Sequence, residues 1–313
     1  IRGKKIYDPR TTTTVYSNNA ALVLADFINN YTDYDVDWTQ AGLAADYCDA
    51  EIATGVKRWQ TNLLIQDRRD PHEWIEVLRE YANCYVFIDN GVAQIVPDEA
   101  GASVLSITAG DMPAGSFKLT KLSQRDIPTQ VYCDYLLPVE NAIGWSTETE
   151  AAIDSPTADD LRRITDLKMY GYQHATQAKR KAVQHLNRAT LEDLIADFDL
   201  WEKGLHLTRG DIVDITHPFG ITNKLFRVLD VNAVSKERYR VRAREYQAGT
   251  YSSDVVTDPT PDDTSLPDIR NVPTPGALTL SENLYTIASG ETRARLDISF
   301  TAVEYAWFRG YEY

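Results

Sequence analysis

The sequence predicts a multidomain α+β protein, built from antiparallel, β-rich domains with a few packed helices and followed by the start of an all-β module. Three observations lead to this class. Apolar residues fall at helical spacing in four segments, they alternate with polar residues in many short runs, and the composition changes near Gly249. A chain of 313 residues has room for two or three domains, each with its own core.

We expect four regions along the chain. Residues 1–140 form an α+β domain with helices and a hairpin, and residues 141–248 form a β-rich domain with one helix. Residues 249–276 form a linker, because Pro, Asp and Thr dominate there and large apolar residues are few. Residues 277–313 form an all-β module of three strands, too few to close a sandwich. We therefore expect the chain to be a segment of a longer protein.

Four helices are expected in order. The first follows possible N-caps at Ser17 to Asn19 in "SNNAALVLADFINNY", and the second covers "TQAGLAADYCDAEI" and buries a face that includes Leu43. The third has the clearest signal, "DPHEWIEVLREY", where Asp70 is an N-cap and Pro71 stands at the first helical position. The fourth is "TQAKRKAVQHLNRA", with its alanines and Leu186 on one face.

Strands are expected between and after these helices. "VKRWQTNLLIQ" reads as one strand, and "CYVFIDNGVAQIVPD" reads as two strands joined at Asn90-Gly91, a pair that tolerates positive φ. "FKLTKL" and "TQVYCDYLLP" follow. The acidic segment "NAIGWSTETEAAIDSPTADD" reads as a surface loop. After the fourth helix, "LEDLIADFDLW", "LTRGDIVDITH" and "LFRVLDV" complete an antiparallel run with the last strand, "RYRVRAREY".

This last strand carries four arginines at every second position, Arg238, Arg240, Arg242 and Arg244. Because side chains in a strand alternate between two faces, all four project from one face. Three interpretations are open: an ordinary polar outer face, an inter-subunit or partner face for an acidic neighbour, or a nucleic-acid groove, which the acidic composition disfavours.

The formal net charge of −14 argues against sequence-specific nucleic-acid binding, which needs a basic face. No apolar run is long enough to predict a membrane span. Cys48, Cys84 and Cys133 lie far apart and read as buried thiols, and the five histidines do not fall at ligand spacing. We expect no metal and no cofactor.

Motifs of catalysis are also absent from the sequence: it has no GxSxG, Walker, GxGxxG or HExxH pattern. We expect no enzyme, with one possibility left open, a glycosidase whose two carboxylates come from distant positions. Trp38, Trp59, Trp145 and Trp201 could form sugar-stacking platforms, while the simpler interpretation places Trp74 and Trp201 in the core.

The segments "RGKKIYDPRT", "YSNNAALVLADFINN" and "AADYCD", in this order and spacing, resemble the central region of phage tail-tip proteins of the lambda J type. The resemblance continues through "RWQTNLLI", the "DNG" hairpin and "QAKRKAVQHL" to "GLHLTRGDIVDITH". It covers residues 1–247. One departure is Asn19-Ala20-Ala21, where the family has Asn-Pro-Ala.

The resemblance implies a structural component of the phage tail tip, the central hub that closes the tail tube and supports host recognition and DNA passage. It implies a homotrimer at the distal tip of a virion made in the bacterial cytoplasm. The implied neighbours are tail-tip and tape-measure proteins, and a host receptor bound through regions outside this chain. "PTPGALTLSENLYTIASGETRARLDISFTA" resembles the first strands of a fibronectin type III-like module, which the family places after the hub.

A further possibility within the resemblance is the hub of a gene transfer agent or a related contractile device. An alternative function from another class is a carbohydrate-binding or carbohydrate-active surface protein with an accessory fibronectin type III module. It requires two carboxylates that converge in a cleft.

Overall fold

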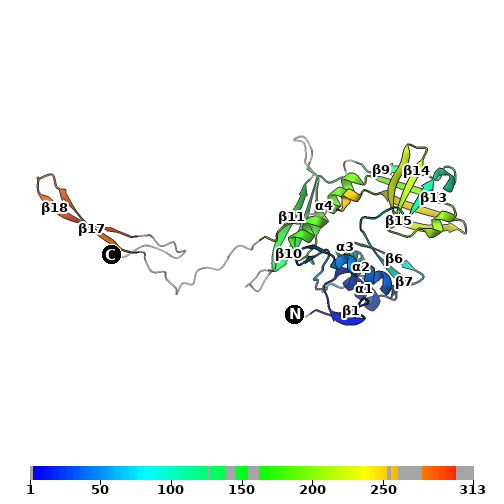
Figure 1. The fold of residues 1–313 in the computed structure, drawn as a ribbon, viewed down its shortest axis with the longest axis horizontal. Coiled ribbons are helices and arrows are strands. Elements are labelled where there is room, and N and C mark those ends of the chain that lie inside the picture. Colours follow the sequence, from blue (N-terminus) through cyan, green and yellow to red (C-terminus); the bar gives the residue numbers. More distant parts are fainter. Residues whose placement is uncertain are drawn as a thin grey trace. The chain divides into compact units, whose positions relative to one another are not determined.

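The computed structural model describes residues 3–123, 125, 127–138, 145–153, 162–251, 255–259 and 277–300. Within these ranges the fold is mixed and mostly β, with four α-helices and several separate sheets. The chain divides into two compact units, Ile1–Pro259 and Thr260–Tyr313. Figure 1 shows the first unit with its helices labelled. The α+β class is thus confirmed.

Three helices build the N-terminal part of the first unit: α1 (Ala20–Tyr31), α2 (Trp38–Asp49) and α3 (Pro71–Ala82). Each begins at a side chain that accepts hydrogen bonds from the first free backbone N–H groups, namely Asn19, Asp37 and Asp70. The three predicted helices are confirmed. Leu43 is 56% exposed, however, because α2 buries the small side chains on its other face.

Short strands surround these helices. β1 (Lys5–Asp8) pairs with β2 (Thr13–Tyr16), and β4 (Glu51–Ala53) pairs with β5 (Val56–Lys57). A three-stranded sheet has the order β3-β7-β6, from Asp35–Val36, Val92–Pro97 and Cys84–Asp89.

The Asn90-Gly91 hairpin between β6 and β7 is confirmed, since both residues have positive φ (48° and 85°), as a tight turn between strands requires. The strand expected over residues 56–66 is wrong beyond Lys57: an irregular segment runs to α3, with one isolated bridge between Gln60 and Asn19. The side chain of Trp59 is buried in the core and holds this segment there. Its ring stacks on that of Tyr172, with 5.8 Å between the ring centroids.

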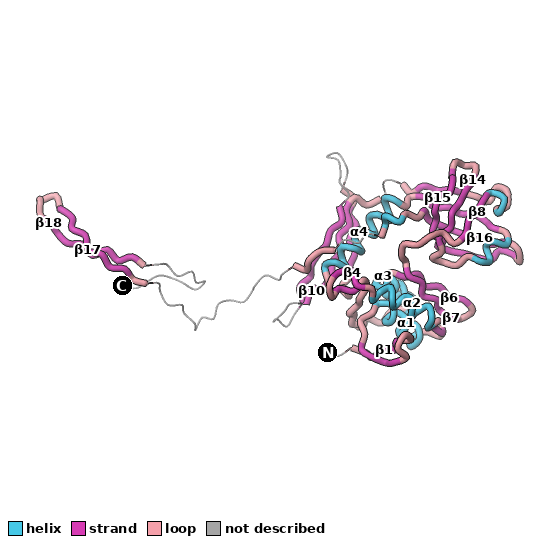
Figure 2. Tube along the Cα trace, in the orientation of Figure 1, coloured by secondary structure: helices cyan, strands magenta, loops and turns pink. Residues whose placement is uncertain are grey.

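The fourth helix, α4 (Ala175–Leu191), packs on a three-stranded sheet (Figure 2). The order is β11-β10-β12, with β10 (Gln130–Pro138) in the centre, β11 (Trp145–Ile153) antiparallel and β12 (Ile164–Lys168) parallel. The predicted loop is wrong over residues 145–153. These residues are polar because β11 is an edge strand and exposes part of its surface. They form a strand because they pair with β10, a contact that the local sequence does not indicate. Its remaining residues lie outside the described ranges.

A six-stranded sheet has the order β8-β14-β15-β16-β13-β9. One of its faces forms a hydrophobic core separate from the one that contains Trp59. Its strands span Leu105–Thr108, Ile212–His217, Ile221–Ser235, Arg238–Glu245, Leu194–Leu200 and Lys118–Lys121 in that spatial order. Short 3₁₀ turns, η1 (Ala109–Asp111), η2 (Glu202–His206) and η3 (Ala248–Thr250), connect the elements. Trp201, expected in the core by the simpler interpretation, is 44% exposed between β13 and η2.

The expected boundary at residue 140 falls between β10 and β11, which pair along nine residues. β8 and β9, from before this boundary, complete the sheet formed by β13 to β16. The four-region division stays a prediction.

In the second unit, β17 (Thr279–Thr286) and β18 (Thr292–Ser299) form an antiparallel hairpin. The third strand expected there, with Trp307 and Tyr311, lies outside the described residues.

Candidate functional site

The four alternate arginines lie on β16, between β13 and β15. Val241 and Ala243 between them are fully buried in the core of the six-stranded sheet, so the arginines project from its other face. The side chains of Arg240 and Arg242 are 63% and 57% exposed. The structure therefore confirms the strand and places these two arginines at the surface.

Carboxylates on β13 lie beside this arginine row. In the strand register Arg240 stands opposite Asp199, and Arg242 stands opposite Asp197. Asp199 accepts from Arg238 Nε at 2.8 Å and from Arg240 Nε at 3.1 Å. Arg242 Nε lies 3.7 Å from an Asp197 oxygen. Three of the four charges therefore have a partner within the sheet.

The buried position of Asp199 would by itself raise the pKa of its carboxyl, but the hydrogen bonds from Arg238 and Arg240 outweigh burial and hold that pKa below its usual value. The sequence contained the signal for this pairing. Asp197 and Asp199 recur at period two in the strand "LIADFDL", on the face opposite Ala196, Phe198 and Leu200.

Arg244 differs from the other three arginines. It stands opposite Ile195 on β13 and Arg227 on β15, and its Nε has no hydrogen-bond partner among the described residues. Burial lowers the pKa of the His185 imidazole on α4, and nearby positive charges that include Arg244 lower it further. A role of the arginine row as a partner face stays a prediction.

Sequence reasoning missed a buried charge network centred on Asp98, which follows β7. Its carboxylate accepts from Arg188 Nη2 of α4 and from the Tyr251 hydroxyl, both at 2.5 Å, and lies 3.8 Å from Arg227 Nε of β15. Burial would raise the pKa of Asp98, but Arg188 and Arg227 outweigh it and hold that pKa below its usual value. Asp98 thus joins the small sheet, α4 and the six-stranded sheet.

Both arginines of this network have further partners. Arg227 Nη1 donates to Gly210 O at 2.9 Å and Nη2 donates to Glu99 O, while its guanidinium stacks on Tyr246 at 5.1 Å from the ring centroid. Arg188 Nε lies 3.6 Å from Glu192, whose carboxylate accepts from Thr250 at 2.7 Å. Two buried acids and two arginines therefore balance one another.

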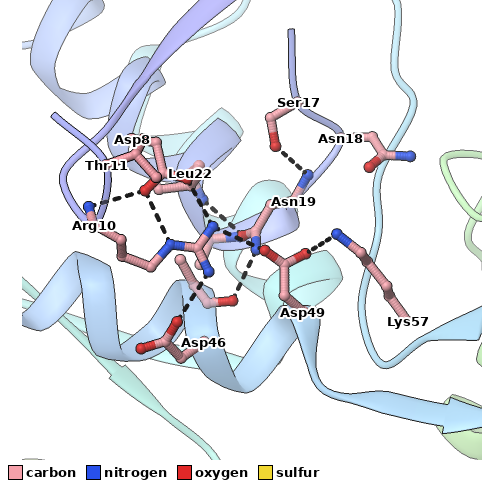
Figure 3. A network of polar contacts seen from close by, with 12 residues as sticks. Asp8, Arg10, Thr11, Ser17, Asn18, Asn19, Leu22, Asp46, Asp49 and Lys57 are labelled. Carbon is pink, nitrogen blue, oxygen red and sulfur yellow. Dashed lines mark hydrogen bonds and ion pairs between the residues drawn. The ribbon is translucent and has the colours of Figure 1, made fainter. Parts of the chain in front are cut away.

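A second network lies at the N-terminal hairpin (Figure 3). Arg10 donates to Asp8 through Nε at 2.9 Å and Nη2 at 2.8 Å, and also binds Asp46 at 3.0 Å and Asp49 at 2.8 Å. The hydrogen bonds from Arg10 lower the pKa of Asp8. Lys57 adds a bond to Asp49 at 2.7 Å.

Asn19 connects the same hairpin region to α2. It is 1% exposed, caps α1 by accepting from the N–H groups of Ala21 and Leu22, and donates through Nδ2 to Ala45 O at 2.8 Å. The three segments "DPR", "SNNAA" and "AADYCD", which carry the first part of the resemblance, therefore meet in space. These contacts account for Arg10, for Asn19 and for the acidic residues of the three segments.

Neither network has the composition of a metal centre. Among the described residues, no group of three His, Cys, Asp or Glu side chains could hold a metal ion. No helix in the same ranges is long and apolar enough to cross a membrane. Of the four tryptophans considered for sugar stacking, Trp59 is only 2% exposed and Trp201 is 44% exposed.

Solved structures that match this chain include the following three. A chain of the native gene transfer agent virion is 19% identical with a TM-score of 0.48, and the match covers 78% of this chain and 51% of that chain. The 43 kDa tail protein of prophage MuSo2 from Shewanella oneidensis is 12% identical with a TM-score of 0.48, and the match covers 80% of this chain and 71% of that chain. The tail protein from Neisseria meningitidis MC58 is 10% identical with a TM-score of 0.44, and the match covers 61% of this chain and 60% of that chain.

The chain spans about half the length of the gene transfer agent protein. No curated protein matches it significantly. A protein family described as "Putative phage tail protein" matches residues 70–231, more than half of the chain. This range includes α3, α4, the sheet of β10 to β12, and most of the six-stranded sheet. The chain therefore belongs to the family of putative phage tail proteins.

Proposed function

We propose that this phage tail protein forms part of the central hub at the distal tip of the tail, where it closes the tail tube and supports host recognition and DNA passage. The family match over residues 70–231 carries the proposal at the level of the tail. The position in the hub is supported by the segments that resemble lambda J type proteins, whose residues meet in the Arg10 and Asn19 contacts.

Immunogold electron microscopy of the source particles tests the position, with an antibody raised against residues 1–247. Label at the distal end of the tail is the expected result. Label along the tube or at the head-proximal end would contradict the hub while leaving the tail role intact. Intact tails without label anywhere, in particles whose denatured proteins react with the antibody, would show that the epitopes are covered. A tail-tip subcomplex would then be labelled after mild dissociation.

The hub proposal includes self-association as a homotrimer through the arginine face of β16. Arg240 and Arg242 are the most exposed cations of the row, and an acidic chain offers many carboxylates as partners. Sedimentation at low and high salt tests this. The double variant R240Q/R242Q should lower the association constant, and K118Q/K121Q on the edge strand β9 of the same sheet serves as the control. Equal association of both variants would remove this face from the interface.

DNA passage fits an acidic protein, because negative walls do not retain a negatively charged polymer. An electron cryomicroscopy map of the tail tip should therefore show a channel lined by acidic or neutral side chains. A channel lined by arginine would contradict this part of the proposal.

We also propose that the second unit begins a fibronectin type III-like module. Leu280, Leu284, Leu296 and Ile298 lie on one face of the β17–β18 hairpin, and each is more than half exposed there. A two-stranded hairpin with such a face is marginally stable unless another layer covers it. In the protein purified from the source particles, slow amide hydrogen exchange across Thr279–Ser299 is expected, because the remaining strands of the module would cover this face, and fast exchange throughout would contradict a folded module.

A further inference from the structure

A cleft of about 490 Å³ lies beside Asp98, within the first unit. This volume falls in the range of about 300 to 1,000 Å³ that is usual for ligand sites. Its walls come from α2, the β4–β5 hairpin, Glu99 and Ala100, α4 and the residue after η3. Tyr47 and Tyr251 line it, and their hydroxyl groups donate to Asp98, at 2.9 Å to the backbone oxygen and at 2.5 Å to the carboxylate. The two rings are thereby held in place.

Hydrogen-bond donors in the cleft wall lack acceptors. Arg58 stacks on Tyr47 with its guanidinium carbon 4.4 Å from the ring centroid. Among the described residues Arg58 has no ion pair, and its Nε has no hydrogen-bond partner. Gln184 of α4 is only 5% exposed, and its Nε2 likewise has no partner there. These two nitrogens are closed off from solvent, so a ligand would reach Arg58 through its terminal amino groups, which form no hydrogen bond with the described residues. Such a guanidinium favours a ligand that supplies acceptors.

We propose that this cleft binds a single carboxylate carried by a polypeptide next to an aromatic or apolar group. An ionised carboxylate only accepts hydrogen bonds, and a guanidinium fork can hold both of its oxygens. Tyr47 and Tyr251 supply the apolar walls. The exposed Glu51 and Glu99 at the cleft disfavour a ligand with several negative charges, such as nucleic acid. This proposal does not depend on where in the tail the protein lies.

The test uses the full chain and three probes in ligand-observed NMR titrations. N-acetyl-L-tyrosine represents a chain terminus, N-acetyl-tyrosyl-glutamic acid amide represents an acidic side chain, and N-acetyl-L-tyrosinamide is the matched ligand without a carboxylate. We expect at least one acidic probe to bind about tenfold more tightly than the tyrosinamide, and the tighter of the two identifies the source of the carboxylate.

Two variants assign the binding to the cleft. R58Q should weaken the acidic probe by about tenfold, with unchanged circular dichroism. R69Q is the control, because Arg69 also stacks on an aromatic ring, that of Trp74 at 5.0 Å, but lies outside the cleft. If neither acidic probe binds, if the tyrosinamide binds equally well, or if R58Q binds like R69Q, the proposal is overturned.

Discussion

At the scale of single residues, Asp98 has the largest expected effect on stability. Its replacement by Asn leaves Arg188 and Arg227 in a buried site without their shared carboxylate. Breaking a buried pair in this way costs about 3–5 kcal/mol, because the remaining charge has no compensation. Urea unfolding of D98N should show this loss in the free energy of unfolding.

The control for D98N is D67N, since Asp67 forms an exposed pair with Arg69. Exposed pairs of this kind contribute at most about 1 kcal/mol. Similar losses in the two variants would show that the Asp98 network is not a stabilising centre.

The partly buried imidazole of His185 predicts a pH dependence. Burial lowers its pKa in the folded state below the ordinary value of about 6.5. The unfolded chain therefore binds the proton more readily, so stability is complete above that value and falls as the pH drops through it toward the folded pKa. Unfolding measured between about pH 7 and pH 5 should show a smaller loss in H185Q than in the parent.

H72Q is the matched control for this pH series, because His72 is exposed on α3. Its pH dependence should equal that of the parent. A series in which H185Q also follows the parent would show that other groups, such as carboxyls, cause the loss.

At the scale of elements, α4 receives its N-terminal cap from a distant part of the chain. The Asp258 carboxylate accepts from Ala175 N–H at 2.5 Å and pairs with the His174 ring at 3.0 Å. The side chain of His174, the residue that precedes the helix, forms no capping hydrogen bond. D258A should lower the stability by about 1 kcal/mol, the usual value of an N-cap, and should speed hydrogen exchange in the first turn of α4.

D33A is the control for the cap, because Asp33 lies exposed in the connection after α1. Equal exchange rates in the first turn of α4 for D258A and D33A would show that Asp258 does not stabilise the helix.

The β1–β2 hairpin depends on one guanidinium group that binds Asp8, Asp46 and Asp49 together. A lysine has one ammonium group and cannot reproduce this planar arrangement of donors. R10K should therefore lower stability by about 1 kcal/mol and speed amide exchange over residues 5–16. R69K, at an exposed arginine with one carboxylate partner, should have no effect on that exchange, and an effect of equal size would contradict the assignment.

At the scale of the whole molecule, the second unit differs from the first in burial. Every residue of β17 and nearly all of β18 are exposed, whereas the first unit contains two large buried clusters. Thermal unfolding should therefore show the first unit as one cooperative transition. A chain shortened to residues 1–259 should unfold at nearly the same midpoint, measured by calorimetry. A clearly lower midpoint would show that the second unit stabilises the first.

The sequence by itself determined all four helices, the Asn90-Gly91 hairpin and the arginine strand. Each depends on local chemistry: an N-cap, a helical period, a turn pair or a strand period. The resemblance drawn from short motifs also led to the phage tail, which the family match supports. The prediction of secondary structure was wrong where the local signals are weak, at the irregular segment around Trp59 and at the polar strand β11.

Only the tertiary structure decided what the charged residues contact. Asp98, Arg188 and Arg227 are distant in sequence and meet because β7, α4 and β15 converge, and no local pattern marks an acid that will be buried. Likewise, the partners of the arginine strand depend on the register between β13 and β16, which sets Asp197 and Asp199 beside it. Periodicity places a side chain on a face, but the neighbour on that face is set by long-range pairing.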